Sequence, residues 1–323
     1  MSRKFICLAA LCLVMLILTC LGSAQTAARQ KIIIDTDIGD DIDDAFAVAL
    51  ALSSPEVEIL GITTAWGDTQ VRARIVDRLL CETGMDQIPI AAGATTESKF
   101  AIDHAPWARS YWKPVRHYPP AVDFILDQIK RHPNQITLIA IAPLTNVGAV
   151  IERDPDTFRK LKRVVIMGGS VHRGYNDLGY TPDHGPDPEY NIASDIASAR
   201  RLFTSGVPLY VMPLDSTQLK LDEVKRELIF QQSTPLTDAL TLLYHLWGQQ
   251  TPTLYDPVAV AFSLEPQLCP TQSMHLDVDA KGYTRPTGGP ANVQVCLNSK
   301  SDEFFHLYMT RLLSQKLSGH CSR

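Results

Sequence analysis

The chain has 323 residues, of which 45% are hydrophobic and 20% are charged, and its formal net charge is −5. These fractions are those of globular proteins and exclude a disordered or fibrous chain, while the length allows one large domain or two smaller ones. The chain has 30 basic and 35 acidic residues and lacks the basic footprint of proteins that bind nucleic acid or anionic membrane surfaces. We therefore expect neither of these as a partner.

The first 24 residues have the order of a secretory signal peptide. Two basic residues precede an apolar run from Phe5 to Leu18, and small residues follow up to Ala24. The run is short for a membrane span. We predict cleavage after Ala24 and export to the periplasm or the medium. Thr19-Cys20 weakly resembles a lipoprotein cleavage site, so a lipid anchor on Cys20 is an alternative.

Removal of this leader changes both the charge and the cysteine count. The mature chain, residues 25–323, has 28 basic and 35 acidic residues and a net charge of −7. Four cysteines remain, and their spacing matches no zinc motif. They are Cys81, Cys269, Cys296 and Cys321. All three full pairings are open, and we expect one disulfide or none.

The mature chain alternates short apolar runs with longer periodic segments. We predict strands at Lys31–Asp35, Glu58–Thr64, Ile88–Ala91, Ile136–Ile141, Arg163–Met167 and Pro208–Pro213. We predict helices at Asp43–Leu52, Val71–Thr83, Ala121–Arg131, Leu144–Glu152 and Ser194–Ser205, and less regular helical stretches near residues 221–230, 236–248, 255–263 and 302–317. The strands are continuous Ile, Val and Leu runs, typical of strands buried on both faces. This pattern predicts a single α/β domain with a mainly parallel, helix-flanked sheet.

Six aspartates lie within ten residues, from Asp35 to Asp44, where the first predicted strand ends and a helix begins. In α/β sheets, chemistry gathers at the carboxyl ends of the strands. Two carboxylates about 4 Å apart repel by about 4 kcal/mol at an effective dielectric near 20, so such a cluster must be protonated, solvated or bound to a cation. Oxygen ligands of this kind suit Ca²⁺ or Mg²⁺. The alternative is that Asp43 or Asp44 only caps the helix and the other carboxylates are solvated.

The segment Asp-Thr-Asp-Ile-Gly-Asp-Asp-Ile-Asp-Asp-Ala, residues 35–45, resembles the signature of the inosine–uridine-preferring nucleoside hydrolases, which are ribonucleoside N-ribohydrolases. The usual family pattern, D-x-D-x-G-x-D-D-A, is two residues shorter. Further matching segments follow in the family's order at Gly61–Thr64, Ile90–Gly93, Ala142–Asn146, Met167–Gly169, Glu189–Asn191 and Asp256–Pro257. The resemblance covers residues 31–262 and implies the family's Rossmann-like fold.

The resemblance implies hydrolysis of the N-glycosidic bond of ribonucleosides to ribose and free base. It implies a Ca²⁺ ion held by Asp37, Asp44, Asp256 and the backbone carbonyl of Ile141. The attacking water would be bound to this ion, whose charge lowers the pKa of the water. Asp37 is the expected general base. A small-molecule nucleoside is the implied partner, nucleoside salvage is the implied role, and a homo-oligomer is left open.

The resemblance also assigns residues to the sugar. Asp43 would bond to a ribose hydroxyl, and the two inserted residues leave Asp40 or Asp41 as substitutes for it. Glu189 and Asn191 match the family's E-F-N segment, which contacts the ribose and supports an oxocarbenium-like transition state. A single displacement with inversion is expected. In isolation, the Glu-Tyr-Asn segment could instead be only a turn before a helix.

Three departures from the family pattern bear on which substrate the protein prefers. Asp68 stands where the family has an asparagine that faces the sugar, and Tyr255 replaces a histidine that assists the leaving base. Asp183 lies at the distance of a further family asparagine. Aromatic and histidine residues in the loops 104–117 and 172–184 fit either a lid over the base or packing against helices. We expect these differences to alter the base preference.

Two alternatives to the nucleoside hydrolase interpretation remain at this point. The apolar strand followed by Asp35-x-Asp37 also resembles the opening motif of haloacid-dehalogenase-type Mg²⁺ phosphatases, although Gly39 stands where that motif has Thr or Val. A non-catalytic periplasmic protein that binds nucleosides or sugars with a structural Ca²⁺ is the second alternative, because a fold does not guarantee activity.

Overall fold

The computed structural model describes residues 28–176, 178 and 185–319, and within them the chain forms an eight-stranded sheet. In spatial order its strands are β3 (Ile90–Ala92), β2 (Val57–Thr64), β1 (Gln30–Thr36), β4 (Ile136–Ala140), β5 (Arg163–Met167), β6 (Leu209–Met212), β10 (Val293–Cys296) and β7 (Thr271–Met274). All neighbouring strands are parallel except β7, which runs antiparallel to β10. The predicted α/β fold with a mainly parallel sheet is confirmed.

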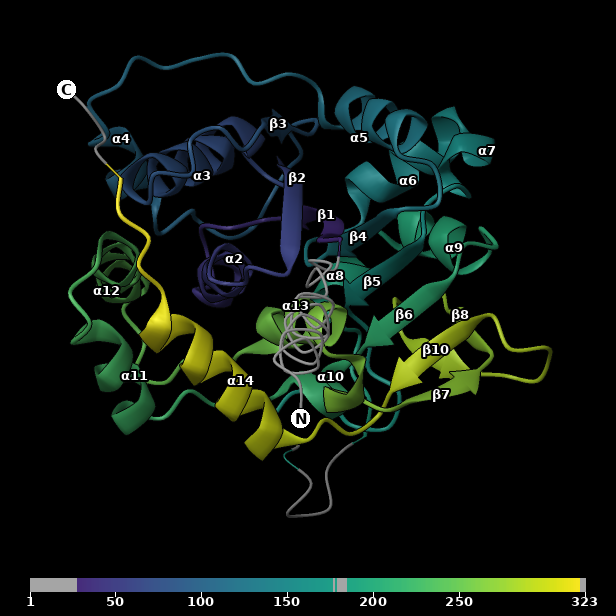
Figure 1. The fold of residues 1–323 in the computed structure, drawn as a ribbon. Coiled ribbons are helices and arrows are strands. Elements are labelled where there is room, and N and C mark those ends of the chain that lie inside the picture. Colours follow the sequence, from purple (N-terminus) through teal and green to yellow (C-terminus); the bar gives the residue numbers. More distant parts are fainter. Residues whose placement is uncertain (1–27, 177, 179–184, 320–323) are drawn as a thin grey trace, which may run out of the picture.

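Helices cover both faces of this sheet (Figure 1). On one side lie α2 (Asp43–Leu52), α3 (Thr69–Glu82), α12 (Pro235–Trp247), α13 (Tyr255–Leu264) and α14 (Ser301–Ser314). On the other side lie α5 (Ala121–Arg131), α6 (Thr145–Arg153), α9 (Ile196–Phe203) and the hairpin of β8 (Leu276–Val278) and β9 (Thr284–Pro286). The shorter elements are α4 (Ala105–Arg109), α7 (Pro155–Phe158), α8 (Tyr190–Ser194), α10 (Leu214–Thr217), α11 (Glu223–Phe230) and the 3₁₀ turn η1 (Pro266–Leu268).

The two faces of β1 belong to two separate hydrophobic cores. Ile32 and Ile34 pack into the core that contains α2 and α13, whereas Ile33 packs into the core that contains α5 and α6. All three side chains are fully buried. This alternation follows from the two-residue period of a strand, and it explains why the sequence of β1 is continuously apolar.

The order of the strands reverses at β1. From β1 the chain continues to β2 and β3 on one side, and then returns to place β4, β5 and β6 on the other side. The carboxyl ends of β1 and β4 are therefore adjacent, and the Ile141 backbone N–H donates to the Asp35 carbonyl at 2.8 Å. A crevice outside the strand ends at such a reversal is where open α/β sheets bind ligands.

The predicted elements largely agree with the structure. Helices α2 and α5 have the predicted bounds. The helix predicted at 194–205 is instead two helices, because Asp195 leaves the helical conformation and its carboxylate caps α9 through the Ser198 N–H at 3.0 Å. The strands β7 to β10 and the short helices were not predicted, since they are brief and lack strong periodicity.

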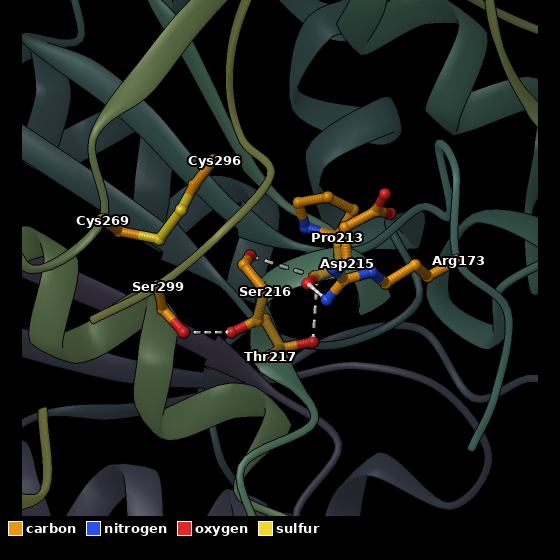
Figure 2. Close-up of a disulfide and its surroundings, with 8 residues drawn as sticks. All are labelled: Arg173, Pro213, Asp215, Ser216, Thr217, Cys269, Cys296 and Ser299. Atoms are coloured by element: carbon orange, nitrogen blue, oxygen red, sulfur yellow. Dashed lines mark hydrogen bonds between the residues drawn. A yellow bond between two sulfur atoms is a disulfide. The ribbon is translucent and has the colours of Figure 1, made fainter. Parts of the chain in front are cut away.

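Disulfides connect distant parts of the chain. Cys269, just after η1, is bonded to Cys296 at the end of β10 (Figure 2). Cys81 on α3 is disulfide-bonded as well, so the expectation of at most one disulfide is wrong. Cysteine spacing could not reveal this, because pairing depends on which segments the fold brings together.

Next to this disulfide, Asp215 on α10 fixes the loop that follows β5. Its carboxylate accepts from the backbone N–H groups of Val171 at 2.9 Å and His172 at 2.8 Å. Its carbonyl accepts from the Arg173 side chain at 3.4 Å (Figure 2). The Ser299 hydroxyl donates to the neighbouring carbonyl of Ser216 at 2.6 Å. The loop behind the end of β5 is therefore tied to the C-terminal part of the chain.

Some predictions concern residues that the structure does not describe. The signal peptide at 1–24, the lipid anchor at Cys20, and the residues Tyr180, Asp183, His184 and Cys321 lie outside the described residues. The domain boundary at residue 25 stays a prediction. Among the helices in the described segments, none is long and apolar enough to cross a membrane.

Candidate active site

A cavity of about 1040 Å³ opens at the carboxyl ends of β1, β4 and β5. Its floor and walls come from the residues after these strands and from the first turns of α2, α8 and α13. The exposed segment 97–101 forms part of its rim. The cavity therefore lies at the reversal of the strand order, where the topology places a ligand site.

Three buried carboxylates meet on one side of the cavity. Asp43, Asp44 and Asp256 each offer an oxygen within 4.8 Å of the others, and each is at most 4% exposed. Asp43 and Asp44 lie in the first turn of α2, and Asp256 lies in the first turn of α13. The packing of these two helices brings the three together, and the Asp43 carboxylate accepts from the Asp256 backbone N–H at 3.2 Å.

Burial raises the pKa of all three carboxyls well above the ordinary value, and the neighbouring carboxylates raise it further. The Thr36 hydroxyl donates to Asp44, which opposes the rise. The partial positive charge of two helix N-termini offsets only part of the repulsion. Within the described residues none of the three carboxylates forms an ion pair, and only Asp44 is lowered in pKa by the Arg72 charge. Such a set of buried oxygen ligands fits a divalent cation, which would favour the charged forms.

Asp37 lines the same cavity but lies outside this three-carboxylate set. It is 6% exposed, and burial raises its pKa to about 8, while the Arg72 guanidinium lowers it. Among the predicted ligands, Ile141 also lines the cavity. The close set thus contains Asp43, which the resemblance assigns to the sugar, and not Asp37. The full ligand set and the catalytic roles stay predictions.

Arg72 of α3 binds the loop that carries the aspartates between β1 and α2. Its side chain is fully buried and donates to the backbone carbonyls of Asp37 and of Trp66, the latter at 2.7 Å. It also binds the Asp40 carboxylate with both terminal nitrogens, one of them at 3.1 Å. Asp40 lies between Gly39 and Asp43, in the part of the loop that is two residues longer than the family pattern. This part of the loop is therefore anchored by an ion pair with the buried Arg72.

The three candidates for the hydrogen bond to the sugar, Asp40, Asp41 and Asp43, differ in their surroundings. Asp40 is engaged by Arg72. Asp41 is exposed, and its carboxylate accepts from the adjacent Ile42 N–H at 2.6 Å. Asp43 belongs to the buried carboxylate set on the cavity wall. All three residues line the cavity, so the assignment of the sugar contact to Asp43 stays a prediction.

Glu189 and Asn191 also line the cavity. Glu189 is 2% exposed, and its carboxylate accepts from the N–H groups of Gly169 at 2.8 Å, Asn191 at 2.9 Å and Ile192 at 3.2 Å. Burial raises its pKa to about 7, against the lowering effect of these donors. The Asn191 amide donates to the Met167 carbonyl at 3.1 Å. The segment thus begins a helix and also lines the cavity.

Tyr255 also lines the cavity and directly precedes Asp256. Its ring packs edge-on against Tyr175, with 6.3 Å between the ring centres. Burial, with the nearby Asp43 carboxylate, raises its pKa to about 12. Its hydroxyl is therefore protonated at neutral pH and can donate a hydrogen bond toward a ligand.

Asp68 is not brought to the cavity. It is exposed, and its carboxylate caps α3 by accepting from the Val71 N–H at 3.1 Å. From the same loop it is Trp66, with a positive φ of 66°, that lines the cavity instead. A helix cap explains Asp68 in full, since an aspartate before the first turn satisfies an unpaired backbone donor.

Two aromatic residues of the loop 104–117, Trp107 and Tyr111, pack against α3 and do not line the cavity. Arg78 lies 4.3 Å from the centre of the Trp107 ring, and Arg74 lies 4.3 Å from that of Tyr111. Both rings are about 5% exposed, whereas Trp112 of the same loop is 46% exposed and also does not line the cavity. Packing, rather than a lid, accounts for Trp107 and Tyr111, whereas Tyr175 of the second loop does line the cavity.

Sequence reasoning did not foresee two buried charged residues that support the site from outside the cavity, Asp35 and Arg72. Asp35 is fully buried away from the cavity, where it accepts from Thr63 at 2.5 Å and Asn146 at 2.8 Å and so ties β1 to β2 and α6. Arg72 left one signal in the sequence, because it shares the buried face of α3 with Ile75, Val76 and Leu79. An arginine on an apolar helix face needs a partner inside the protein.

The mainly parallel α/β fold, the cavity at the strand ends and the buried carboxylates agree with an enzyme of the nucleoside hydrolase type, which hydrolyses N-glycosyl bonds. The chain belongs to the family described as inosine-uridine preferring nucleoside hydrolase, whose model matches residues 32–306. Members of this family are metal-dependent, and the acidic cluster agrees with that property. The family membership sets the phosphatase alternative aside.

Two relatives illustrate the similarity in sequence. The chain is 31% identical to the non-specific ribonucleoside hydrolase RihC of Salmonella agona, over 86% of this chain and 95% of the relative. It is 30% identical to uridine nucleosidase 1 of Arabidopsis thaliana, over 79% of this chain and 80% of the relative.

Solved structures show the same fold. A plant nucleoside hydrolase, PpNRh1, superposes with a TM-score of 0.75 at 24% identity and covers 88% of this chain and 99% of its own. A purine-preferring ribonucleoside hydrolase from Gardnerella vaginalis superposes with a TM-score of 0.71 at 25% identity, covering 88% and 98%.

Proposed function

We propose that this protein hydrolyses the N-glycosidic bond of ribonucleosides to ribose and free base and uses Ca²⁺ to do so. The observation that carries the proposal is the buried set of Asp43, Asp44 and Asp256 in a cavity at the strand reversal. The relatives that act on ribonucleosides, RihC and uridine nucleosidase 1, support the same substrate class.

The donor set fits a calcium ion. Carboxylates on α2 and α13 would hold it, and Asp37 and the backbone carbonyl of Ile141 line the same cavity. Ca²⁺ takes six to eight oxygen ligands in flexible geometry, which suits several carboxylates from separate segments together with hydroxyls of a ligand. When bound, such an ion supplies Lewis-acid activation of water and a fixed anchor for sugar hydroxyls.

The protein's own groups supply the remaining chemistry. The Asp37 carboxylate accepts a proton from the attacking water, because Asp37 lines the cavity and its backbone carbonyl is anchored by a hydrogen bond from Arg72. Asp43 accepts a hydrogen bond from a ribose hydroxyl. Glu189 and Asn191, which line the same cavity, contact the sugar, and the surrounding negative charge stabilises the positive charge that develops on it. A single displacement inverts the anomeric carbon.

We also propose that the mature protein, residues 25–323, acts outside the cytoplasm in nucleoside salvage. The support is the order of basic, apolar and small residues in the first 24 positions. N-terminal sequencing of protein recovered from the periplasm or the medium tests the cleavage site. Cleavage before Cys20 with a lipid attached would replace the soluble form by an anchored one.

Two substitutions distinguish the general base from the metal ligands. Asp37→Asn should keep the bound metal and lower kcat by at least about a hundredfold, in the range expected for a lost general base. Asp256→Ala should lose both the metal and the turnover of inosine and uridine. Asp156→Asn is the matched control, because its side chain is 84% exposed on the surface. Normal turnover by Asp37→Asn would contradict the role of Asp37 as general base. An Asp256→Ala protein that retains the metal would contradict the proposed set of metal ligands.

A further inference from the structure

Trp66, which follows β2, places its indole in the wall of the cavity and has no role in the function proposed above. The residue lines the cavity and is partly exposed, so a ligand can reach the ring. Within the described residues, no other aromatic ring and no cation packs on the face of the indole. An open aromatic face in a ligand cavity is a surface that a bound molecule can cover.

The backbone of Trp66 has an unfavourable conformation. Its φ is 66°, and the next residue, Gly67, has a φ of 62°. Glycine adopts left-handed angles freely, whereas a bulky side chain is strained there. A turn with two successive left-handed residues is normally built from asparagine, aspartate and glycine. Tryptophan at the first of the two positions therefore costs stability in the protein without ligand.

The surrounding structure imposes this conformation. The Arg72 guanidinium donates to the Trp66 carbonyl at 2.7 Å. The Gly67 N–H donates to the Thr96 hydroxyl at 2.7 Å, and the Gly67 carbonyl accepts from the Thr96 N–H at 3.1 Å. Strained residues persist where their surroundings fix them, and they cluster at functional sites. A strained, fixed tryptophan that lines the cavity therefore indicates a contact with the ligand.

The same contacts place Trp66 between the aspartate loop and the rim of the cavity. Arg72 joins its carbonyl to the loop that contains Asp40. On the other side, a Cβ atom on Gly67 would lie 3.2 Å from the Ser98 Cβ, so this turn adjoins the exposed rim segment 97–101. The proposed function assigns the ribose to the buried carboxylates. The planar base of a nucleoside then extends from the ribose toward the rim, where the indole lies.

We propose that the Trp66 indole stacks on the nucleobase of the bound nucleoside and so acts as a substrate-binding residue that favours the larger purine bases. The inference rests on the proposed function and adds to it a contact for the base. Every nucleobase has a π-face, so an aromatic side chain can stack on a pyrimidine as well as on a purine. The buried apolar area grows with the size of the base, so the contact strengthens from uridine to inosine.

The test measures the binding of uridine, inosine and methyl β-ribofuranoside, which has the sugar but no base, in the presence of Ca²⁺. All proteins carry Asp37→Asn, so that calorimetry measures binding without turnover. Trp66→Ala should raise Kd about tenfold for uridine and further for inosine, within the range of base–aromatic stacking. The Kd of methyl β-ribofuranoside should not change. Trp66→Phe should keep most of the affinity for both nucleosides, because an aromatic ring remains.

Trp66→Gly distinguishes the ring from the backbone. It lacks the indole as Trp66→Ala does, but glycine relieves the left-handed strain. Its melting temperature without ligand should exceed that of Trp66→Ala, and its Kd for both nucleosides should be as high. A lower melting temperature than that of Trp66→Ala would contradict the strain. Recovered affinity in Trp66→Gly would show that the loss came from the backbone, and this would overturn the proposal.

Trp112→Ala is the matched control, because Trp112 is 46% exposed and does not line the cavity. Its Kd for all three ligands should be unchanged. Trp66→Ala overturns the proposal if it weakens methyl β-ribofuranoside as much as the nucleosides, or if it leaves the nucleosides unaffected. If the protein with Asp37 intact binds nucleosides but releases no ribose, the proposed function fails instead, and the Kd values still decide the stacking contact.

Discussion

Replacement of His104 by phenylalanine should change how the stability of the protein depends on pH. His104 is fully buried beside the aspartate loop, where its backbone N–H donates to the Gly39 carbonyl at 2.9 Å. Neither of its ring nitrogens has a hydrogen-bond partner among the residues described. Burial lowers its pKa from 6.5 to about 4, and the nearby Arg72 charge lowers it further. The ring is therefore neutral in the folded protein at physiological pH.

The sign and size of the effect follow from this shift. Between about pH 4 and 6.5 the unfolded chain binds a proton at His104 that the folded protein does not, so the folded state loses stability as the pH falls. With these two pKa values, the loss from about pH 8 to about pH 5 is about 2 kcal/mol, and it approaches about 3 kcal/mol below pH 4. At neutral and higher pH this residue contributes no pH dependence.

The assay is urea unfolding of both proteins at several pH values between about 8 and 5. The buried carboxyls titrate in both proteins, so the quantity to compare is the difference in unfolding free energy between the unsubstituted protein and His104→Phe. That difference should shift by about 2 kcal/mol in favour of His104→Phe on acidification. A difference that stays constant with pH would refute the assignment of His104 as a buried neutral histidine.

Three further predictions concern the supports of the site. Asp68→Ala should lower stability by about 1 kcal/mol in thermal unfolding, through loss of the α3 cap, and leave KM for uridine unchanged; a raised KM would show a sugar contact instead. Arg72→Met should lower stability by about 3–5 kcal/mol, because Asp40 is left unpaired, and Asp40→Asn in the same protein should restore part of it; additive losses would contradict a coupled pair. Cys269→Ala should cost about 3.5 kcal/mol for a bridge that spans 27 residues, as measured by urea unfolding, and an unchanged midpoint would mean that the bridge does not constrain the unfolded chain.

Much of the fold followed from periodicity in the sequence. The strand β5 has the predicted bounds, and β1, β2 and β4 differ from the prediction by one residue at one or both ends. These strands are long apolar runs, so burial on both faces left an unambiguous pattern. The hairpin of β8 and β9 has no recognisable pattern in the sequence, because strands of three residues with exposed positions are too short to show a periodicity.

The candidate site was predictable only where a motif carried it. Every aspartate of the cluster except Asp35 lines one cavity together with the Glu189–Asn191 segment, as the strand-end rule implies. Asp68 shows the limit of that rule, because a residue after a strand can also turn outward and cap the next helix. The Arg72–Asp40 pair joins residues 32 positions apart, and no local pattern could reveal it.

The most direct test of the account is a calcium titration of metal-free protein while ribose release from uridine and inosine is followed. The account predicts no release without metal and saturable release as Ca²⁺ is added, since the buried carboxylates of Asp43, Asp44 and Asp256 require a cation to assemble the site. Release at full rate in the presence of a chelator, or no release at saturating Ca²⁺, would contradict it.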